Sequence, residues 1–216
     1  SETETWDFEE ILSLLATDAQ ADLTMVSFEN LIVPSAKNSD TVTPESALSL
    51  LTTLGADVVA SGFTEAFDQG LDGLTSTVNA IAGRGMAVVG AYGTQAERTP
   101  LMRTLGNVKV AILHYTDGLT KTGTNKMKNA DAAFAVPQAD PTEIAADIAS
   151  ARALGAQFVV VSLHWGSVGK TAATKAQTEL AQQIADAGAD VIAGVRTNII
   201  QPVVWLTGKD ASGGSK

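Results

Sequence analysis

Short apolar runs and helical patterns alternate along the chain. Six runs rich in valine, alanine and isoleucine are each bounded by glycine, aspartate or another turn former, which is typical of buried strands. The predicted strands lie in residues 21–29, 55–63, 85–93, 108–117, 157–166 and 189–195.

Between most of these runs the apolar residues recur at helical spacing. The predicted helices lie in residues 7–19, 43–55, 70–85, 140–155 and 171–188. Two of them carry start signals: Thr43 is the expected N-cap ahead of Pro44, and Asp140 is the expected N-cap of the fourth helix. Capped helices alternating with buried strands predict an α/β fold with a largely parallel sheet.

Two segments interrupt this alternation. Residues 33–42 form a polar stretch, and residues 118–140 are long and polar for a simple connection. We expect both to be loops, and loops of the second length are usually functional or mobile.

Composition narrows the classes of function. The 216 residues carry a formal net charge of −10, which argues against a non-specific nucleic-acid binder and suits cationic partners such as metal ions. The absence of cysteine excludes disulfides and thiolate metal sites. No apolar run reaches the roughly 18–20 residues of a membrane span.

Polar and aromatic side chains follow the predicted strands, and ligands of open α/β sheets bind at the carboxyl ends of strands. We therefore expect a binding rim there. Its candidate residues are Glu29, Asn30, Phe63, Thr64, Glu65, His114, Tyr115, Asp117, His164, Trp165, Arg196, Thr197 and Asn198. A histidine at a strand end has two readings, a hydrogen-bonded structural residue or a ligand, and the sequence leaves both open. The chain contains no Walker A pattern, no G-x-G-x-x-G after a strand, and no G-x-S-x-G or H-E-x-x-H motif.

Four stretches, in order, resemble those of the bacterial capsule-synthesis family, the CapA-type proteins linked to poly-γ-glutamate synthesis. "ADLTMVSFEN" resembles that family's "ADLTIVNLET", and "GADVVASGFTEAFDQG" resembles its "G-DVVSLANNHALDYG". "VKVAILHYTDG" is similar to "VKIAFLAYT-G", and "ADVIAGVRTNIIQPVVWL" is similar to "ADVVIGHHPHVLQPVE". The stretch "SLHWG" also fits the family.

The resemblance implies a layered α/β sandwich similar to calcineurin-like metallophosphoesterases, as one domain over residues 1–216. It implies that His164 and Glu29 belong to a metal site, because Glu, Asn and His at strand ends form a rim similar to a two-metal centre in that family. It also implies an extracellular or cell-envelope location.

The chain departs from the family at the motif centres. Phe63, Thr64 and Glu65 stand where the family has "NNH", and Val195 to Asn198 stand where it has "HHPH". Phe63 and Val195 cannot bind a metal, and Arg196 places a permanent positive charge where a cation would sit. We therefore expect no intact two-metal hydrolase centre, no firmly bound cofactor, and at most one weakly held divalent ion at Glu29 and His164.

Arg196 is instead expected to pair with an acidic rim residue, with Glu65 and Glu29 as leading candidates, or to bind an anionic ligand such as a carboxylate. The predicted ligand-binding residues are Glu65, Arg196, Asn198, Phe63, Tyr115, Trp165 and His114.

Three functions stay open. The chain is a non-catalytic component of capsule or poly-γ-glutamate biosynthesis that binds an anionic polymer, a small-molecule or anion binder, or an active metal-dependent hydrolase. The family's first strand, with a "GD" pair, and its "YSLGNF" strand do not occur in this sequence. We expect either that the chain is longer in nature or that another segment or subunit covers the sheet edges they would fill.

Overall fold

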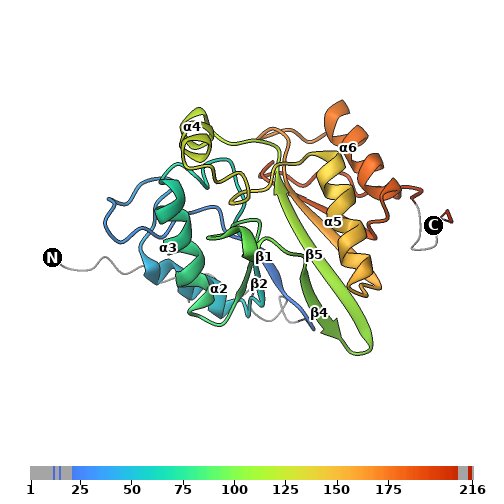
Figure 1. Ribbon diagram of the computed structural model, residues 1–216, viewed down its shortest axis with the longest axis horizontal. Helices are drawn as coiled ribbons and strands as arrows, with labels where there is room; N and C mark the ends of the chain where they lie inside the picture. The colour runs from blue at the N-terminus through green and yellow to red at the C-terminus, as the bar shows by residue number, and fades with distance from the viewer. Residues whose placement is uncertain (1–11, 13–14, 16–20, 209–213, 216) are drawn as a thin grey trace. The chain divides into compact units, whose positions relative to one another are not determined.

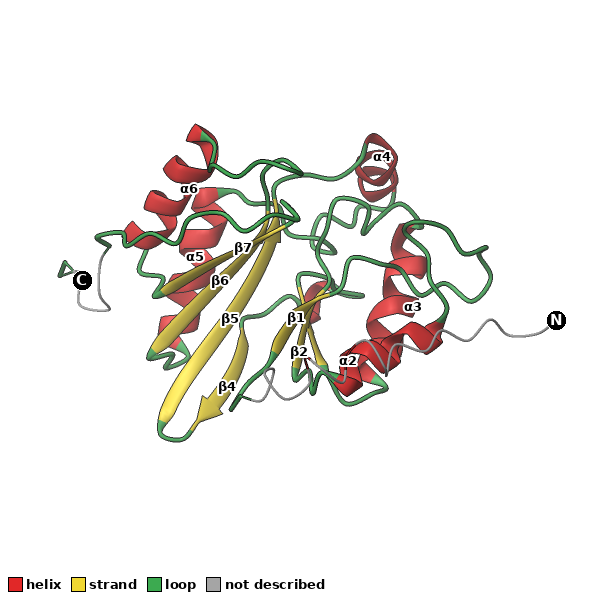
Figure 2. Ribbon diagram, turned by 180° about the vertical axis from the view of Figure 1, so that it is seen from behind, coloured by secondary structure: helices red, strands yellow, loops and turns green. Residues whose placement is uncertain are grey.

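The computed structural model describes residues 12, 15, 21–208 and 214–215, and Figures 1 and 2 show it from opposite sides. The chain forms two compact units. Unit 1 is residues 1–98 with 119–136, and unit 2 is residues 99–118 with 137–216. The helix predicted over residues 7–19 lies outside the described residues except for Leu12 and Leu15.

Unit 1 is built on a small parallel sheet. Its strands are β1 (Met25–Ser27), β2 (Val58–Ala60) and β3 (Ala87–Val89), in that order, so β2 is central. All three residues of β2 are buried, as expected for a strand with neighbours on both sides.

Unit 1 also contains five helical segments among the residues that the structure describes. They are η1 (Glu45–Leu48), α2 (Ser49–Thr53), α3 (Gly70–Ala82), η2 (Gln95–Glu97) and α4 (Lys121–Asn129). The α3 side chains that recur at helical spacing, Leu74, Thr77 and Ile81, are buried. Thr77 satisfies its hydroxyl by accepting from the Ile32 amide at 2.9 Å and donating to the Gly73 carbonyl at 2.8 Å.

Unit 2 holds the larger sheet. It contains β4 (Leu101–Leu105), β5 (Val108–Thr116), β6 (Phe158–His164) and β7 (Val191–Val195), in the order β4-β5-β6-β7. The β5–β6 and β6–β7 pairs are parallel, whereas β4 runs antiparallel to β5. The carboxyl ends of β5, β6 and β7 therefore meet at one edge of the sheet.

Helices α5 (Pro141–Ala153) and α6 (Lys175–Asp186) lie together on one face of this sheet (Figures 1 and 2). They bury the odd-numbered side chains of β5 and β6, because alternate residues of a strand face opposite sides. The Asp140 side chain accepts from the Thr142 and Glu143 amides at 2.8 and 3.0 Å, which confirms the predicted cap of α5.

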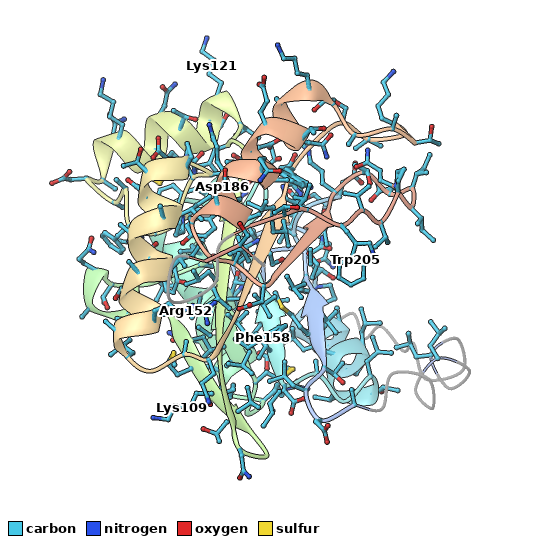
Figure 3. All side chains as sticks on the ribbon, turned by 90° about the vertical axis from the view of Figure 1, so that its right-hand side faces the viewer. Lys109, Lys121, Arg152, Phe158, Asp186 and Trp205 are labelled. Carbon is cyan, nitrogen blue, oxygen red and sulfur yellow. The ribbon has the colours of Figure 1, made fainter. Side chains whose placement is uncertain are left out.

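Arg152 of α5, which is labelled in Figure 3, lies at the end of the unit 2 sheet where β6 and β7 begin. Its guanidinium lies 2.7 Å from the Asp190 carboxylate and also donates to the carbonyls of Ala156 and Gly188. Asp190 in turn accepts from the Val159 amide at 2.7 Å, so one ion pair ties α5 to β6 and to the start of β7.

After β7 the chain runs beside α6, held by side-chain hydrogen bonds at both ends. Gln177 donates to the Gln201 side chain at 3.2 Å, and Gln182 donates to the Thr207 carbonyl at 2.8 Å. Between these ties the segment is exposed and apolar: Val203 is 95% exposed and Trp205, which is labelled in Figure 3, is fully exposed. We call residues 199–206 the apolar segment.

The structure confirms the α/β class with mostly parallel strands alternating with helices, and all six predicted strands are present. Three details differ. Residues 118–140 contain α4, which begins after its N-cap Thr120, and β4 was not predicted. The first turn after Thr43 is 3-10 helix with Pro44, rather than Thr43, at the N-cap position. The expectation of a single domain stays a prediction.

Candidate functional site

Three loops of unit 2 meet where β5, β6 and β7 end. Asp117 directly follows β5, Trp165 and Gly166 directly follow β6, and Arg196 directly follows β7. Because the three strands are adjacent and parallel, residues far apart in the sequence come together at this edge. We call this group of residues the unit 2 rim.

Asp117 links the three loops. One of its carboxylate oxygens lies 2.6 Å from Nη1 of Arg196, and the other accepts a hydrogen bond from the Gly166 amide at 2.8 Å. The side chains of Arg196 and Asp117 are 29% and 34% exposed, so the pair is accessible to solvent. Arg196 was expected to pair with an acidic residue of the rim, and within unit 2 that residue is Asp117. Pairing with Glu65 or Glu29, the leading candidates, stays a prediction, because both belong to unit 1.

The backbone around Arg196 is held in an uncommon conformation. Arg196 has φ of 93° and Asn198 has φ of 55°, both in the region that favours glycine. Between them Thr197 is buried, donates through its hydroxyl to the Ile199 carbonyl at 2.8 Å, and accepts through its own carbonyl from the Gly169 amide at 2.9 Å. These contacts fix the turn that presents Arg196.

A small open hollow lies beside this pair. Its volume is about 90 Å³, and its lining residues are Asp117, Trp165, Gly166, Thr174, Ala176, Gln177 and Leu180. Most of these come from the loop after β6 and from the first turns of α6. We call it the Trp165 hollow. It is far smaller than the roughly 300–1,000 Å³ of a pocket for a drug-sized ligand.

Two glycines allow close packing around the Trp165 hollow. A β-carbon on Gly194 of β7 would overlap Nε1 of Trp165, so the indole lies directly against the β7 backbone. A β-carbon on Gly166 would lie 2.7 Å from the Gln177 side chain, and Gly166 has φ of 84°. Trp165 therefore depends on glycine at position 194, and the loop around it depends on glycine at position 166.

A capping box shapes the α6 wall of the hollow. Thr174 accepts from the Gln177 amide at 3.2 Å while the Gln177 side chain accepts from the Thr174 amide at 3.0 Å, a reciprocal cap. Gln177 is buried, and its side-chain amide group also reaches Gln201 of the next segment.

The two histidines lie side by side on β5 and β6 with hydroxyl partners. His114 is in register with Ser162, and its Nδ1 lies 2.9 Å from the Ser162 hydroxyl. His164 is in register with Thr116, and its Nδ1 lies 3.3 Å from the Thr116 hydroxyl. Both imidazoles are buried and hydrogen-bonded, which is the structural role expected for a histidine at a strand end. A role as a ligand stays a prediction.

Two of the predicted aromatic ligand residues lie in hydrophobic cores. Phe63 is buried in a core cluster of unit 1, and Tyr115 is buried in that of unit 2. The Tyr115 hydroxyl donates to the Asp147 carboxylate of α5 at 2.8 Å. Of the predicted aromatic residues, Trp165 lines the hollow. A ligand-binding role for Phe63 and Tyr115 stays a prediction.

The remaining predicted residues divide between the units. Glu29 and Glu65 are half-buried residues of unit 1, and Glu29 accepts from the Ser27 hydroxyl at 3.3 Å. Asn198 is an exposed residue of unit 2. The weak metal site expected at Glu29 and His164 would need one ligand from each unit, and it stays a prediction.

The unit 2 rim has one carboxylate, Asp117, and the expectation that the chain lacks an intact two-metal centre stays a prediction. Its carboxylate, Asp117, is already paired with a guanidinium, and a fixed positive charge opposes a bound cation. Across the residues that the structure describes, no three His, Asp or Glu side chains gather as metal ligands. The unit 2 rim itself presents a guanidinium, a carboxylate and an indole.

Sequence reasoning placed Arg196, Trp165 and Asp117 at strand ends but missed four residues that shape the site: Gly166, Gly194, Thr174 and Gln177. The pair Thr174 and Gln177 carried a signal, because Thr-x-x-Gln at a helix start is a capping box. The two glycines carried none, since their importance comes from a contact with another strand or helix.

Comparison with known proteins supports one family. The sequence profile of the bacterial capsule synthesis protein family PGA_cap matches residues 2–210. The PGA biosynthesis protein CapA of Bacillus subtilis is 29% identical over 168 residues, which is 77% of this chain and 43% of that protein. A probable polyglutamine synthesis accessory protein of Mycobacterium tuberculosis is 25% identical over 94% of this chain and 57% of its own length.

The chain thus spans about half the length of the curated relatives it matches. No helix in the described part of the chain is both long and apolar enough to cross a membrane. The profile match covers both units and all the strands that frame the rim, and the chain belongs to the bacterial capsule synthesis protein family PGA_cap.

Proposed function

We propose that this chain takes part in the biosynthesis of a capsule or poly-γ-glutamate polymer as a component that binds the polymer and does not hydrolyse a phosphoester. The observation that carries the proposal is the family match over residues 2–210. The relatives named for PGA biosynthesis and polyglutamine synthesis support the same role. An extracellular or cell-envelope location follows from that role and is part of the proposal.

The geometry of the unit 2 rim supports binding over metal-dependent hydrolysis. A hydrolase of the expected kind needs convergent carboxylate and imidazole ligands around a metal. The unit 2 rim offers a guanidinium fixed by a carboxylate, and a planar guanidinium matches a carboxylate ligand.

The charge of the whole chain limits how an anionic polymer can approach. At a net charge of −10 the chain repels a polyanion at long range, so binding depends on short-range contacts with local cations. In unit 2, the exposed Lys170 lies in the segment before α6, the exposed Lys175 is the first residue of α6, and Arg196 is partly exposed. At about 0.15 M salt the repulsion is screened beyond roughly 8 Å, whereas direct contacts persist.

The test is calorimetric titration of the purified chain with poly-γ-glutamate at moderate salt, with dextran sulfate as a polyanion that lacks carboxylates. Saturable binding of poly-γ-glutamate, stronger than that of dextran sulfate, is the expected result. No binding, or equal binding of both, would overturn the proposal.

The hydrolase alternative is measured on the same sample. The chain is incubated with bis-p-nitrophenyl phosphate and added Mn²⁺ or Zn²⁺. Turnover that depends on the metal, and that is lost on chelation, would establish the alternative and contradict the non-hydrolytic role.

A further inference from the structure

We infer that Arg196 and the Trp165 hollow together form a subsite for a single unit that carries one carboxylate on a short methylene stem. This inference rests on the proposed function for its choice of polymer, and it names the chemical unit of the polymer that the rim recognises. A γ-linked glutamyl unit fits this description, because its free α-carboxylate adjoins the two methylene groups of the polymer main chain.

The carboxylate half of the subsite is Arg196. A guanidinium has five N–H donors, and one nitrogen of this group, Nη1, donates to Asp117. The remaining donors of the partly exposed side chain are open to a ligand. Arg196 is also held in place, because its backbone turn is fixed and its side chain is tied to Asp117. Little side-chain freedom is therefore lost when a ligand binds.

The stem half is the Trp165 hollow. Trp165, Ala176 and Leu180 supply apolar surface, and the indole cannot retreat because it lies against Gly194. Asp117 lines the hollow and also bonds to Arg196, so the two halves adjoin. The volume of about 90 Å³ suits a few carbon atoms and not a ring system.

Asp117 sets the orientation of the ligand. Its carboxylate forms part of the wall of the hollow, so a ligand carboxylate placed inside would meet a like charge. With the stem in the hollow and the carboxylate against Arg196, that repulsion is offset by the guanidinium. The arrangement therefore favours a carboxylate at the end of an aliphatic stem over a bare anion of the same charge.

The experiment uses glutarate as the probe, followed by backbone and indole NMR signals of the whole chain. Matched probes are glutaramide, which has the stem without the charge, and inorganic phosphate, which has the charge without the stem. Glutarate is expected to shift the Trp165 indole N–H and the Gly166 amide. Glutaramide is expected to bind at least about tenfold more weakly, because it lacks the charge that strengthens a hydrogen bond to the guanidinium. Phosphate is also expected to bind at least about tenfold more weakly, because it lacks the stem that would fill the hollow.

Two variants test the two halves separately. Arg196→Gln is expected to weaken glutarate binding about 10- to 100-fold. Gly194→Ala, which displaces the indole, is expected to weaken it while leaving Arg196 present. The matched control is Arg103→Gln on β4, which makes the same charge change on a strand that adjoins β5 and not β7, and should leave binding unchanged.

Failure of the subsite and failure of the proposed function give different results. If poly-γ-glutamate binds the wild type and Arg196→Gln equally, the subsite is wrong and the polymer role survives. If glutarate binds as described but poly-γ-glutamate does not bind, the subsite stands and the polymer role is wrong. Equal shifts with glutarate and phosphate would also refute the subsite, because the hollow would then contribute nothing.

Discussion

Arg196 and Asp117 are 79 positions apart in the sequence, yet their side chains form an ion pair of 2.6 Å across the ends of three strands. Asp117 follows β5, Arg196 follows β7, and β6 lies between them. At roughly 4.8 Å per strand the backbones are about 10 Å apart, a gap that a long arginine side chain spans.

Removing the charge of Asp117 tests how much this pair stabilises unit 2. Asp117→Asn keeps the shape and an acceptor for the Gly166 amide but loses the ion pair. We expect the free energy of unfolding to fall by no more than about 1 kcal/mol, because both side chains are partly exposed. Urea denaturation measures it.

Glu179→Gln is the control for that variant. It breaks the more exposed pair between Lys175 and Glu179, which are separated by 3.5 Å, and should change stability by a few tenths of a kcal/mol. A loss of several kcal/mol in Asp117→Asn would show that the pair is a main support of the fold.

The left-handed backbone conformation at Arg196 predicts that glycine is more stabilising than alanine at this position. Arg196→Gly and Arg196→Ala both delete the side chain, but only glycine adopts φ of 93° without strain. We expect the glycine variant to be more stable than the alanine variant by about 1 kcal/mol in thermal or chemical denaturation. The reverse order would mean that the loop relaxes to another conformation once the side chain is gone.

Adding one methyl group at Gly194 should disturb the hollow. Gly194→Ala places a β-carbon on the Trp165 indole, and overpacking of this kind costs about 1–3 kcal/mol. Gly118→Ala is the matched control, because a β-carbon there meets no atom within 4 Å. Denaturation midpoints compare the two, and equal midpoints would contradict the packing of Trp165 on β7.

Tyr115 separates a structural role from a binding role. Tyr115→Phe removes the hydroxyl that donates to Asp147 inside unit 2, and we expect a loss of about 2 kcal/mol in stability. Glutarate binding by the folded variant should be unchanged. Weaker glutarate binding by the folded variant would show instead that Tyr115 contributes to binding.

Metal content tests the expectation of a degenerate centre. Elemental analysis after exhaustive dialysis should find well below two equivalents of Mn, Fe or Zn per chain, since Phe63, Val195 and Arg196 supply no ligand. A content near two equivalents of metal per chain would contradict the expectation of a degenerate centre. A single weakly held ion would be compatible with it.

The fold could be predicted further than the site. The apolar run of a buried strand such as β6 and the capping residue of a helix such as α5 are local sequence patterns, so both elements could be predicted from the sequence. Strand β4 was missed because Leu101–Leu105 has two polar residues among five and its partner is set by the turn at Gly106. Helix α4 was missed because its sequence is mostly polar and its start depends on Thr120 accepting from the Gly123 amide.

The sequence predicted that Arg196 would pair with an acidic residue, but it did not single out Asp117 as the partner. An arginine at a strand end needs an anion nearby, so pairing was expected. Which carboxylate it meets depends on the order β5-β6-β7 in a separate sheet, and sequence spacing does not fix that order. Glu65 and Glu29 follow strands of the unit 1 sheet, whereas Asp117 follows a strand of the same sheet as Arg196.

The apolar segment that follows β7 bears on how concentrated solutions of this protein will behave. Residues 199–206 contain no charged side chain, and Ile200, Val203 and Trp205 are almost fully exposed. Near neutral pH the net charge of −10 keeps molecules apart and offsets this exposed surface. Close to the isoelectric point of about 4.5 that repulsion disappears, and the same surface should drive precipitation. Acidic crystallisation or storage buffers are therefore the wrong choice, and Trp205→Lys is the substitution to widen the usable range.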